Sequence, residues 1–346
     1  MFSSYKEEDV IILLKDISNM VTPQSTEERE KLIQSGHHYS EMLPIEYVPT
    51  NDYIKIYERS LKLHSKITAS AAKEVAKKII KDKKNPVLVS LARAGTPIGI
   101  LIKHYIEKKY GIKVFHYTIS IIRGKGIDKN AINYILARHD AGSIQFIDGW
   151  IGKGAIQNEL NKAMEEYVDV DPRLAVLSDP AYITEFFGTH EDFLIANSCL
   201  NSTVSGLLSR TFYRDDIIGP DDFHGAMFYD NLINEDRTYE FINEIENNFD
   251  FSDNESNDID NGFNNEVLKI KEEFNIKDIN LIKPSIGEAT RVLLRRIPWK
   301  ILVYSLDDEI NLGHIYQLAN EKNVEICLYP LKNYKACGLI KKLGNN

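Results

Sequence analysis

The segment FIDGWIGKGAI (146–156) decides how this sequence is interpreted, because an apolar, strand-like run leads directly into a glycine-rich turn and then a helix. Asp148 stands at the end of the predicted strand. Three glycines that let the backbone turn tightly follow it: Gly149, Gly152 and Gly154. Main-chain N–H groups in such a turn can bind an anion at the start of a helix, and Lys153 adds a positive charge beside them. The segment therefore predicts the anion-binding end of a strand–helix unit.

The surrounding sequence repeats this alternation of strand and helix. Apolar, strand-like runs occur at VLVSL (87–91), GIKVFHYTISI (111–121), SIQFID (143–148) and RLAVLSD (173–179). Strands that alternate with helices predict a largely parallel sheet covered by helices on both faces. Such sheets bind ligands at the carboxyl ends of their strands. We therefore predict an α/β domain whose chemistry lies in the turns after its strands.

Composition and cysteine spacing limit the class of protein. The 346 residues include 42 Lys and Arg and 51 Asp and Glu, for a formal net charge of −9, and 43% are hydrophobic. These proportions are typical of folded domains. No apolar run is long enough for a membrane span, and the N-terminus lacks the basic region of a signal peptide. Cys199, Cys327 and Cys337 show no CxxC spacing, so neither a disulfide framework nor a cysteine zinc site is expected. We expect a reduced, cytoplasmic protein with no membrane partner.

The charge changes sharply along the chain. Residues 229–264 hold eleven acidic side chains and one basic side chain, whereas 265–346 hold thirteen basic and ten acidic. The stretch FDFSDNESNDIDNGFNNE (249–266) contains too few apolar residues to form a core. We interpret 249–264 as an acidic linker between a domain at 1–248 and a domain at 265–346. An acidic surface loop inside a single domain is the alternative.

The turn at 146–156 resembles the phosphoribosyl-pyrophosphate loop of type I phosphoribosyltransferases, in which acids after a strand hold the ribose and turn amides hold the 5′-phosphate. ARAGTPIG (92–99) is similar to that family's pyrophosphate-binding turn, and RGKGID (123–128) stands where the family has a mobile loop. The resemblance implies a phosphoribosyltransferase-like fold, a phosphorylated ribose substrate, and Mg²⁺ that binds with the pyrophosphate and not in a protein cage. A homodimer is the family-level expectation. The sequence departs from the family at Gly149, which replaces a second acid.

The same resemblance implies roles for individual residues. Asp148 would accept the ribose hydroxyls, while Arg123 and Lys125 would close over the leaving group. The residues that would bind ribose phosphate or pyrophosphate are Arg93, Ala94, Gly95, Thr96, Gly149, Gly152, Lys153, Gly154 and Ala155. The acceptor would be a nucleobase, a nucleoside-like metabolite or an RNA end. Arg210 and Arg214 form either a second anion site or a solvated helix end.

The segment SCLNSTVSGLLSRTF (198–212) suggests a different chemistry. It follows an apolar run, FLIA (193–196), and the pattern predicts a strand, a turn and a helix. Cys199 would then lie near a helix N-terminus, which lowers a thiol pKa, with His190 or His224 as its base. Alternatively, Cys199 is a buried small hydrophobic residue. Two further histidines lie either in a loop or near this thiol as bases: His37 and His38.

Four motifs together resemble one bacterial family over residues 30–245. They are YSEMLP (39–44), ARAGTP (92–97), DGWIGKG (148–154) and SCLNSTVSGLLSRTF (198–212). That family occurs with tellurium-resistance and stress-response operons and has been described both as a phosphoribosyltransferase and as the cysteine protease StiP. The two activities need different residues: a transferase needs Asp148 and the 93–96 turn, and a protease needs Cys199 and a histidine. We place the transferase first, with a cysteine protease and a non-catalytic nucleotide- and RNA-binding sensor as alternatives.

The C-terminal part predicts a small α/β/α sandwich. Its segment IGEATRVLLRR (286–296) resembles the RNA-contacting helix start of Pelota-type domains, and EICLYPLKNYKACGLI (325–340) resembles their ending. The resemblance implies RNA binding through Gly287, Glu288, Thr290, Arg291, Arg295 and Arg296. The family's asparagine is Gly287 here, which removes a base-reading group but leaves the arginines to bind phosphates.

Overall fold

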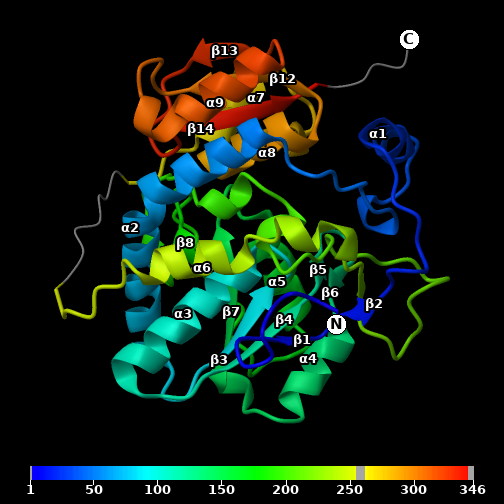
Figure 1. Cartoon of the computed structure of the whole chain (residues 1–346), viewed down its shortest axis with the longest axis vertical. Coiled ribbons are helices and arrows are strands. Elements are labelled where there is room, and N and C mark those ends of the chain that lie inside the picture. Colours follow the sequence, from blue (N-terminus) through cyan, green and yellow to red (C-terminus); the bar gives the residue numbers. More distant parts are fainter. Residues whose placement is uncertain (1, 255–261, 342–346) are drawn as a thin grey trace.

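The structure, a computed structural model, describes residues 2–254 and 262–341 (Figure 1). It contains a large N-terminal α/β domain and a smaller C-terminal α/β domain stacked on it. Residues 255–261 of the predicted linker lie outside the described part. Residues 249–254 lie against the N-terminal domain, where Asp250 pairs with Lys73 (Oδ2–Nζ, 2.8 Å) and Phe251 stacks on Tyr105. Within the described ranges, no helix has the length and apolarity needed to cross a membrane.

The N-terminal domain is built on a six-stranded parallel sheet in the order β1-β4-β3-β7-β8-β9. Its strands are β1 (Ile11–Ile12), β3 (Val87–Leu91), β4 (Phe115–Ile119), β7 (Ile144–Trp150), β8 (Leu174–Ser178) and β9 (Phe187–Thr189). Its helices are α1 (Thr26–Gln34), α2 (Asn51–Asp82), α3 (Gly95–Tyr110), α4 (Lys129–Leu136), α5 (Ala155–Met164) and α6 (Thr238–Glu246). Two short pairs flank the sheet: β2 (Lys15–Asp16) with β10 (Gly225–Ala226), and β5 (Ile121–Ile122) with β6 (Gly126–Ile127).

Helices cover both faces of this sheet, as predicted. Strands β3 and β8 are buried along their whole lengths, which is typical of parallel strands between two helical layers. The apolar sides of α2, α3 and α6 pack on one face, and those of α4 and α5 pack on the other. The carboxyl ends of β3 and β7 therefore open toward the same edge of the sheet, which is the edge that faces the C-terminal domain (Figure 1).

The C-terminal domain is the α/β/α sandwich that the sequence predicts. Its mixed sheet has the order β11-β14-β12-β13, and α7 covers one face while α8 and α9 cover the other. The strands are β11 (Ile282–Pro284), β12 (Pro298–Val303), β13 (Glu325–Leu328) and β14 (Ala336–Ile340). The helices are α7 (Glu266–Glu273), α8 (Ile286–Arg295) and α9 (Glu309–Glu321).

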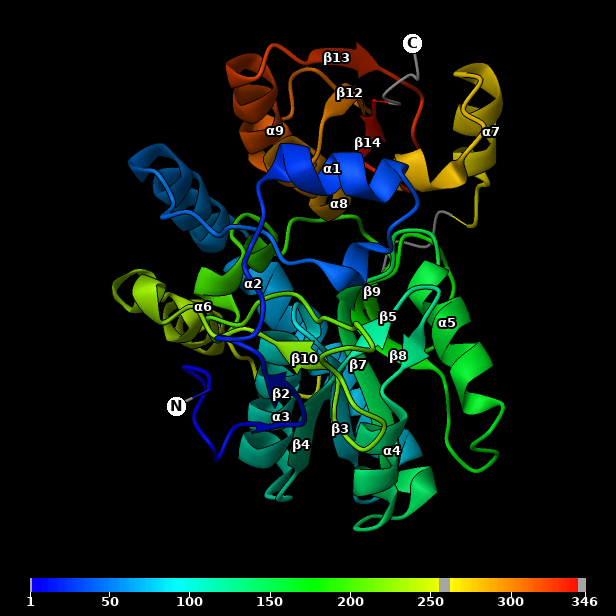
Figure 2. The same ribbon diagram turned by 90° about the vertical axis from the view of Figure 1, so that its right-hand side faces the viewer.

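The two domains share one apolar core. Side chains of α8 and α9, such as Leu293 and Leu312, belong to the same buried cluster as Cys199 and Leu200 of the N-terminal domain. Helix α1 lies against the C-terminal domain (Figure 2), where Glu30 pairs with Arg296 (Oε1–Nε, 2.8 Å). The α8 face thus packs against the N-terminal domain.

A buried carboxylate joins the domains at the start of α8. Asp192, which is 2% exposed, accepts the main-chain N–H of Ile286 (3.0 Å) and of Lys335 (2.8 Å). Burial raises the pKa of Asp192 to about 7, while those amides act in the opposite direction. The neighbouring Glu191 pairs with the Lys335 ammonium. We call Asp192 and its two amide partners the Asp192 clamp.

The strand–turn–helix expected at 193–212 is wrong. The strand in this region is β9, and the chain then forms two short 3₁₀ turns, η3 (Ala196–Ser198) and η4 (Ser202–Val204). Hydroxyl side chains bond to nearby backbone here, as when Ser205 Oγ donates to the carbonyl of Asn201 (2.9 Å). Such local bonds compete with helix formation. Cys199 therefore does not begin a helix.

A charged cluster joins the N-terminal segment to α3 and α6. Nε2 of His104 lies 2.8 Å from Oδ1 of Asp9, and its Nδ1 contacts a carboxylate oxygen of Glu246. Burial alone would lower the His104 pKa, but the two carboxylates raise it to about 9. We call these three residues the His104 cluster, and at neutral pH its imidazole is charged.

Candidate functional site

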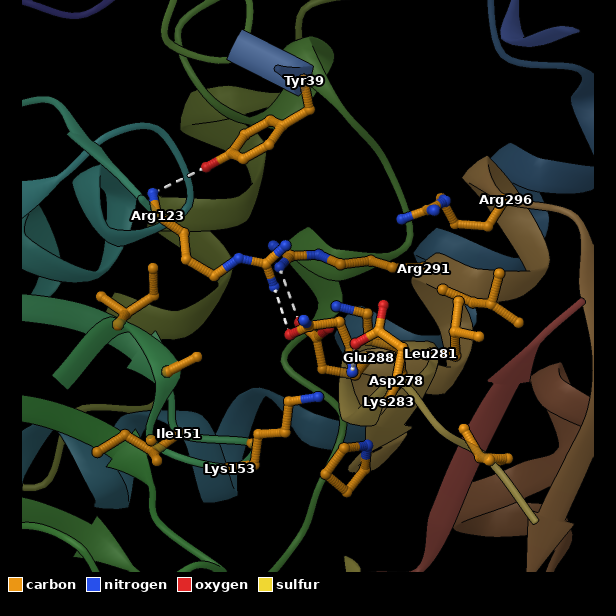
Figure 3. A pocket seen from close by; sticks show the side chains of 18 of the residues that line it. Tyr39, Arg123, Ile151, Lys153, Asp278, Leu281, Lys283, Glu288, Arg291 and Arg296 are labelled. Carbon is orange, nitrogen blue, oxygen red and sulfur yellow. Dashed lines mark hydrogen bonds and ion pairs between the residues drawn. The ribbon is translucent and has the colours of Figure 1, made fainter. Parts of the chain in front are cut away.

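A cavity of about 1360 Å³ lies between the domains at the carboxyl end of β7. The turn before α5 forms its floor, α1 and the Tyr39 segment form one wall, and β11 and α8 form the opposite wall. Figure 3 shows Arg123 and Arg291 extending toward one another across this space, with Lys153 below them. We call this cavity the interdomain cleft.

Asp148 lies at the floor of the interdomain cleft. Its Oδ1 accepts the N–H of Gly149 (2.8 Å), and the residue lines the cleft. Burial raises the Asp148 pKa to about 6; the Gly149 amide and Arg291 act to lower it, and Glu288 to raise it. Gly95 supports this strand end from behind, because a Cβ there would lie 2.6 Å from the Ile147 carbonyl oxygen. At neutral pH Asp148 is mostly ionised and can accept hydroxyl hydrogen bonds.

The glycine-rich turn also faces the cleft. Gly152, Lys153, Gly154 and Ala155 line it, and Gly154 takes the left-handed conformation (φ +79°) that starts α5. Lys153 Nζ donates to the carbonyl of Ile282 in the C-terminal domain (2.8 Å). Burial, together with nearby cations, lowers the Lys153 pKa to about 8. The predicted anion-binding turn is therefore part of an interdomain surface.

Arginines dominate the walls. Arg291 lies over the ring of Trp150 (4.3 Å) and pairs with Glu288 (3.3 Å), and Arg123 donates to Asn280 Oδ1 (3.0 Å). Arg210, for which the sequence allowed either an anion site or a solvated helix end, donates to main-chain carbonyls including that of Met42 and lines the cleft. Burial lowers the pKa of Arg210 to about 10, and the charges of neighbouring arginines lower it in the same direction.

Several residues predicted for the phosphate site lie elsewhere. Arg93 donates to the carbonyl of Leu208 (2.8 Å) and to Asn201, and Thr96 is fully buried against Thr118 (Oγ1–Oγ1, 2.8 Å). Lys125 pairs with Glu41 (3.7 Å) outside the cleft lining. Of the predicted set, those that the cleft lining does not include are Arg93, Ala94, Gly95, Thr96, Lys125 and Gly149. The 92–99 turn supports Asp148 and presents no side chain to the cleft.

The predicted RNA-binding helix α8 turns its residues inward. Glu288, Arg291 and Arg296 line the cleft. Thr290 is buried, with its Oγ1 2.9 Å from Nε2 of His314, and Arg295 donates to the carbonyl of Leu200 in the N-terminal domain (2.8 Å). A Cβ at Gly287 would meet the Trp150 ring at 2.9 Å. The helix therefore presents Arg291 to the cleft and Arg295 to the N-terminal domain.

Cys199 lies in the shared core beneath α8 and is 3% exposed. Burial raises its pKa to about 12, which is the opposite of the lowering expected at a helix start. The Ser60 side chain lies within hydrogen-bonding reach of the thiol, and the Arg295 charge also favours the thiolate. The thiol is thus protonated and covered in this conformation.

The histidines predicted as bases have other partners. His190 Nδ1 lies 2.7 Å from the carbonyl oxygen of Asp179, and His224 Nδ1 lies 2.8 Å from Ser120 Oγ. Of the two histidines at 37–38, His37 lies near Glu41 (3.7 Å), and His38 Nε2 is 3.0 Å from the carbonyl oxygen of Arg123.

Sequence reasoning missed His64, which lies one turn beyond Ser60 on α2. Its Nδ1 is 3.0 Å from the Ser60 carbonyl oxygen and must donate there, so Nε2 carries the lone pair. That Nε2 is buried and has no hydrogen-bond partner among the described residues. Burial lowers the His64 pKa, so the ring is neutral. The only signal in the sequence for His64 is its i, i+4 spacing from Ser60. That spacing indicates a catalytic base only once the structure shows that Ser60 reaches the Cys199 thiol.

Comparison with protein families gives two matches. The model described as "Tellurite-like stress resistance cysteine protease StiP" matches residues 3–246, and the model described as "PELOTA RNA binding domain" matches residues 263–342. The chain belongs to the StiP family. A curated relative from Acinetobacter baylyi (strain ATCC 33305 / BD413 / ADP1), named "Cysteine protease StiP", is 35% identical over 99% of this chain and 94% of its own length.

A comparison with solved structures matches part of this StiP-family chain. The matched structure is a hypoxanthine-guanine phosphoribosyltransferase (hpt-2) from Bacillus anthracis, with 15% identity, a TM-score of 0.28, and coverage of 36% of this chain and 76% of the other. A likeness at this level carries no functional conclusion. Within residues 2–254 and 262–341, no group of three or more His, Cys, Asp or Glu side chains is arranged to hold a metal ion.

Proposed function

We propose that this chain is a cysteine peptidase that uses Cys199 as its nucleophile and is latent in the closed arrangement of its domains. The observation that carries the proposal is the position of Cys199 in the sequence. The residues matched by the cysteine protease family, 3–246, contain Cys199 alone of the three cysteines, because Cys327 and Cys337 belong to the C-terminal domain. The name of the relative that aligns with 99% of the chain supports the same activity.

The surroundings of Cys199 favour His64 as its base over His190 and His224. The Ser60 hydroxyl reaches the thiol, and the neutral His64 ring follows one turn later on the same helix with its basic Nε2 unpaired among the described residues. In the reaction, His64 would take the thiol proton and the thiolate would attack the peptide carbonyl carbon. The C–N bond would break as that proton passes to the leaving amine, and water would then hydrolyse the thioester.

The burial of Cys199 supports latency. A thiol with a pKa of about 12 is almost entirely protonated at neutral pH, and a peptide cannot reach a side chain that is 3% exposed. Because α8 packs directly over η3, movement of the C-terminal domain would uncover the thiol. The Asp192 clamp is the contact most suited to a test, because its two buried amides belong to the C-terminal domain.

The test is proteolysis of an unfolded protein substrate by the full chain. We expect little activity from the wild type, a gain in Asp192→Ala, and loss of that gain in Asp192→Ala/Cys199→Ala. Cys327→Ala, added to Asp192→Ala, is the matched control and should leave the gain unchanged. Equal activity with and without Cys199 would exclude it as the nucleophile, and no activity in any opened variant would refute the peptidase assignment for this chain.

A second candidate is phosphoribosyl transfer, and it rests on Asp148. A carboxylate at the end of β7, directly before a glycine-rich turn that starts a helix, is suited to hold a ribose above turn amides that bind its phosphate. Mg²⁺ would enter with the pyrophosphate, and the acceptor would be a nucleobase, a nucleoside-like metabolite or an RNA end. Because the 93–96 turn lies outside the cleft lining, pyrophosphate would need Arg123 and Arg291 instead.

Calorimetric titration of phosphoribosyl pyrophosphate with Mg²⁺ tests this candidate. Binding by the wild type and by Cys199→Ser, but not by Asp148→Asn, would support a ribose-phosphate site. Absence of binding to the wild type would remove the transferase. A homodimer remains a prediction, which sedimentation of the same samples would test.

A further inference from the structure

The interdomain cleft concentrates positive charge in an acidic protein. Nine of its lining side chains are basic and four are acidic, an excess of five positive charges in a chain whose net charge is −9. Two acidic residues are already paired: Glu30 with Arg296 and Glu288 with Arg291. The cleft therefore has unbalanced charge that an anion would neutralise.

The positively charged side chains in the cleft repel one another. Arg123, Arg210 and Lys283 all line the cleft, and neighbouring arginines act to lower the pKa of both Arg210 and Lys283. The Nε atoms of Arg210 and Arg291 are buried without a hydrogen-bond partner among the described residues. Burying unpaired charge is unfavourable, so a bound anion would recover the lost hydrogen bonds and relieve the repulsion.

The size of the cleft favours a polymer over a small metabolite. Its volume of about 1360 Å³ exceeds the range of roughly 300–1,000 Å³ that is usual for small-molecule sites. Trp150, Trp299 and Tyr39 line it as well, and flat rings between cations are typical of sites in which bases of a single strand stack. The cleft lies between the two domains, where the end of a single strand can enter it.

Carboxylates beside the cations make the site suited to ribose. Asp148 at the floor can accept a hydroxyl hydrogen bond but would repel a phosphate, so it discriminates between positions along a strand. The 2′-hydroxyl is the group that distinguishes RNA from DNA at such a position.

We infer that the interdomain cleft binds the end of a single-stranded RNA, with phosphates on Arg123, Arg210 and Arg291 and a ribose 2′-hydroxyl on Asp148. RNA binding by this chain is thereby a property of both domains, since Arg123, Arg210 and Asp148 belong to the N-terminal domain and Arg291 to α8. The site is separate from Cys199, so the inference does not depend on the proposed peptidase.

The test measures binding of a 3′-labelled octauridylate by fluorescence anisotropy, with an oligothymidylate of equal length beside it. All proteins carry Cys199→Ala, so that peptidase activity plays no part. We expect Arg123→Ala/Arg291→Ala to bind RNA at least tenfold more weakly and to flatten the slope of log affinity against log salt by about 1.4, because two phosphate contacts are lost. Arg138→Ala, at an exposed position just beyond the end of α4, is a control for the loss of an arginine outside the cleft and should change neither value.

Asp148→Asn should retain RNA binding and lose most of the preference for RNA over DNA. Equal binding of RNA by the wild type and the double arginine variant would overturn the inference, as would a wild type without preference for RNA. Photocrosslinking of 4-thiouridine-containing octamers to the wild type gives a second readout that needs no variant. Crosslinks at Trp150 or Tyr39 are expected. Crosslinks confined to residues outside the cleft lining, such as the exposed Lys322 after α9, would also overturn the inference.

Discussion

Alkylation of Cys199 offers the sharpest test of latency. With a pKa of about 12, about one thiol in 10⁴ is ionised at pH 8, against about one in four for an ordinary thiol of pKa 8.5. The thiolate population alone should therefore slow alkylation of Cys199 by about 2,000-fold. Cys327, which is partly exposed on β13, is an internal reference in the same sample.

Asp192→Ala should release this protection. It leaves the buried amides of Ile286 and Lys335 without their acceptor, which costs about 1–3 kcal/mol for each. Every 1.4 kcal/mol lost from the domain contact raises the open population about tenfold, so the Cys199 rate should rise at least tenfold. The Cys327 rate should remain unchanged.

The measurement is a time course of iodoacetamide labelling at pH 8, with each cysteine peptide quantified by mass spectrometry. Asp128→Ala is the matched control, because Asp128 is also a buried carboxylate that accepts two backbone amides, those of Ala131 (3.0 Å) and His224 (2.6 Å), both inside the N-terminal domain. Equal acceleration by both variants would mean general destabilisation. Wild-type Cys199 that reacts as fast as Cys327 would refute the closed, protonated site.

Three further predictions concern stability and domain contact. The pKa of His104 is raised above its unfolded value, so its stabilising contribution is complete below about pH 6.5 and is lost as pH rises to about 9; it amounts to at most about 3 kcal/mol, and thermal melts of His104→Gln should lack this slope. Gly188→Ala should lower the unfolding free energy by about 1–3 kcal/mol, because its Cβ would lie 2.6 Å from the carbonyl oxygen of Ala71, and an unchanged urea midpoint would contradict this. Gly287→Ala would press on the Trp150 ring and should speed proteolytic cleavage between the domains, whereas unaltered cleavage would show that the contact is not needed.

Much of the fold could be predicted because its signals are local. The buried runs of β3 and β8 are short and almost wholly apolar, which is typical of covered parallel strands, and the left-handed conformation of Gly154 favours glycine whatever surrounds it. The polar stretch at 201–205 misled the prediction of a helix, since its hydroxyls bond to the local backbone. Whether such hydroxyls bond to the local backbone or leave it free to form a helix depends on the folded geometry, which the spacing of residues in the sequence does not show.

The chemistry of Asp148 could likewise be anticipated, since a strand end before a glycine-rich turn is a local arrangement. Its partners could not, because Arg210 and Arg291 reach the same cavity from segments that lie more than 60 residues further along the chain. Three of the residues predicted to contact RNA, Glu288, Arg291 and Arg296, line a cleft between the domains, because apolar α8 residues share a core with the N-terminal domain.

By itself, the sequence determined two α/β domains, a glycine-rich turn behind an acidic strand end, and a single cysteine within the protease-like region. Only the tertiary structure decided that this cysteine is buried with a raised pKa, that Ser60 of α2 reaches its thiol, and that basic residues of both domains meet in one cleft. The physical reason is that pKa values and charge repulsion depend on burial and on distances between residues far apart in the chain.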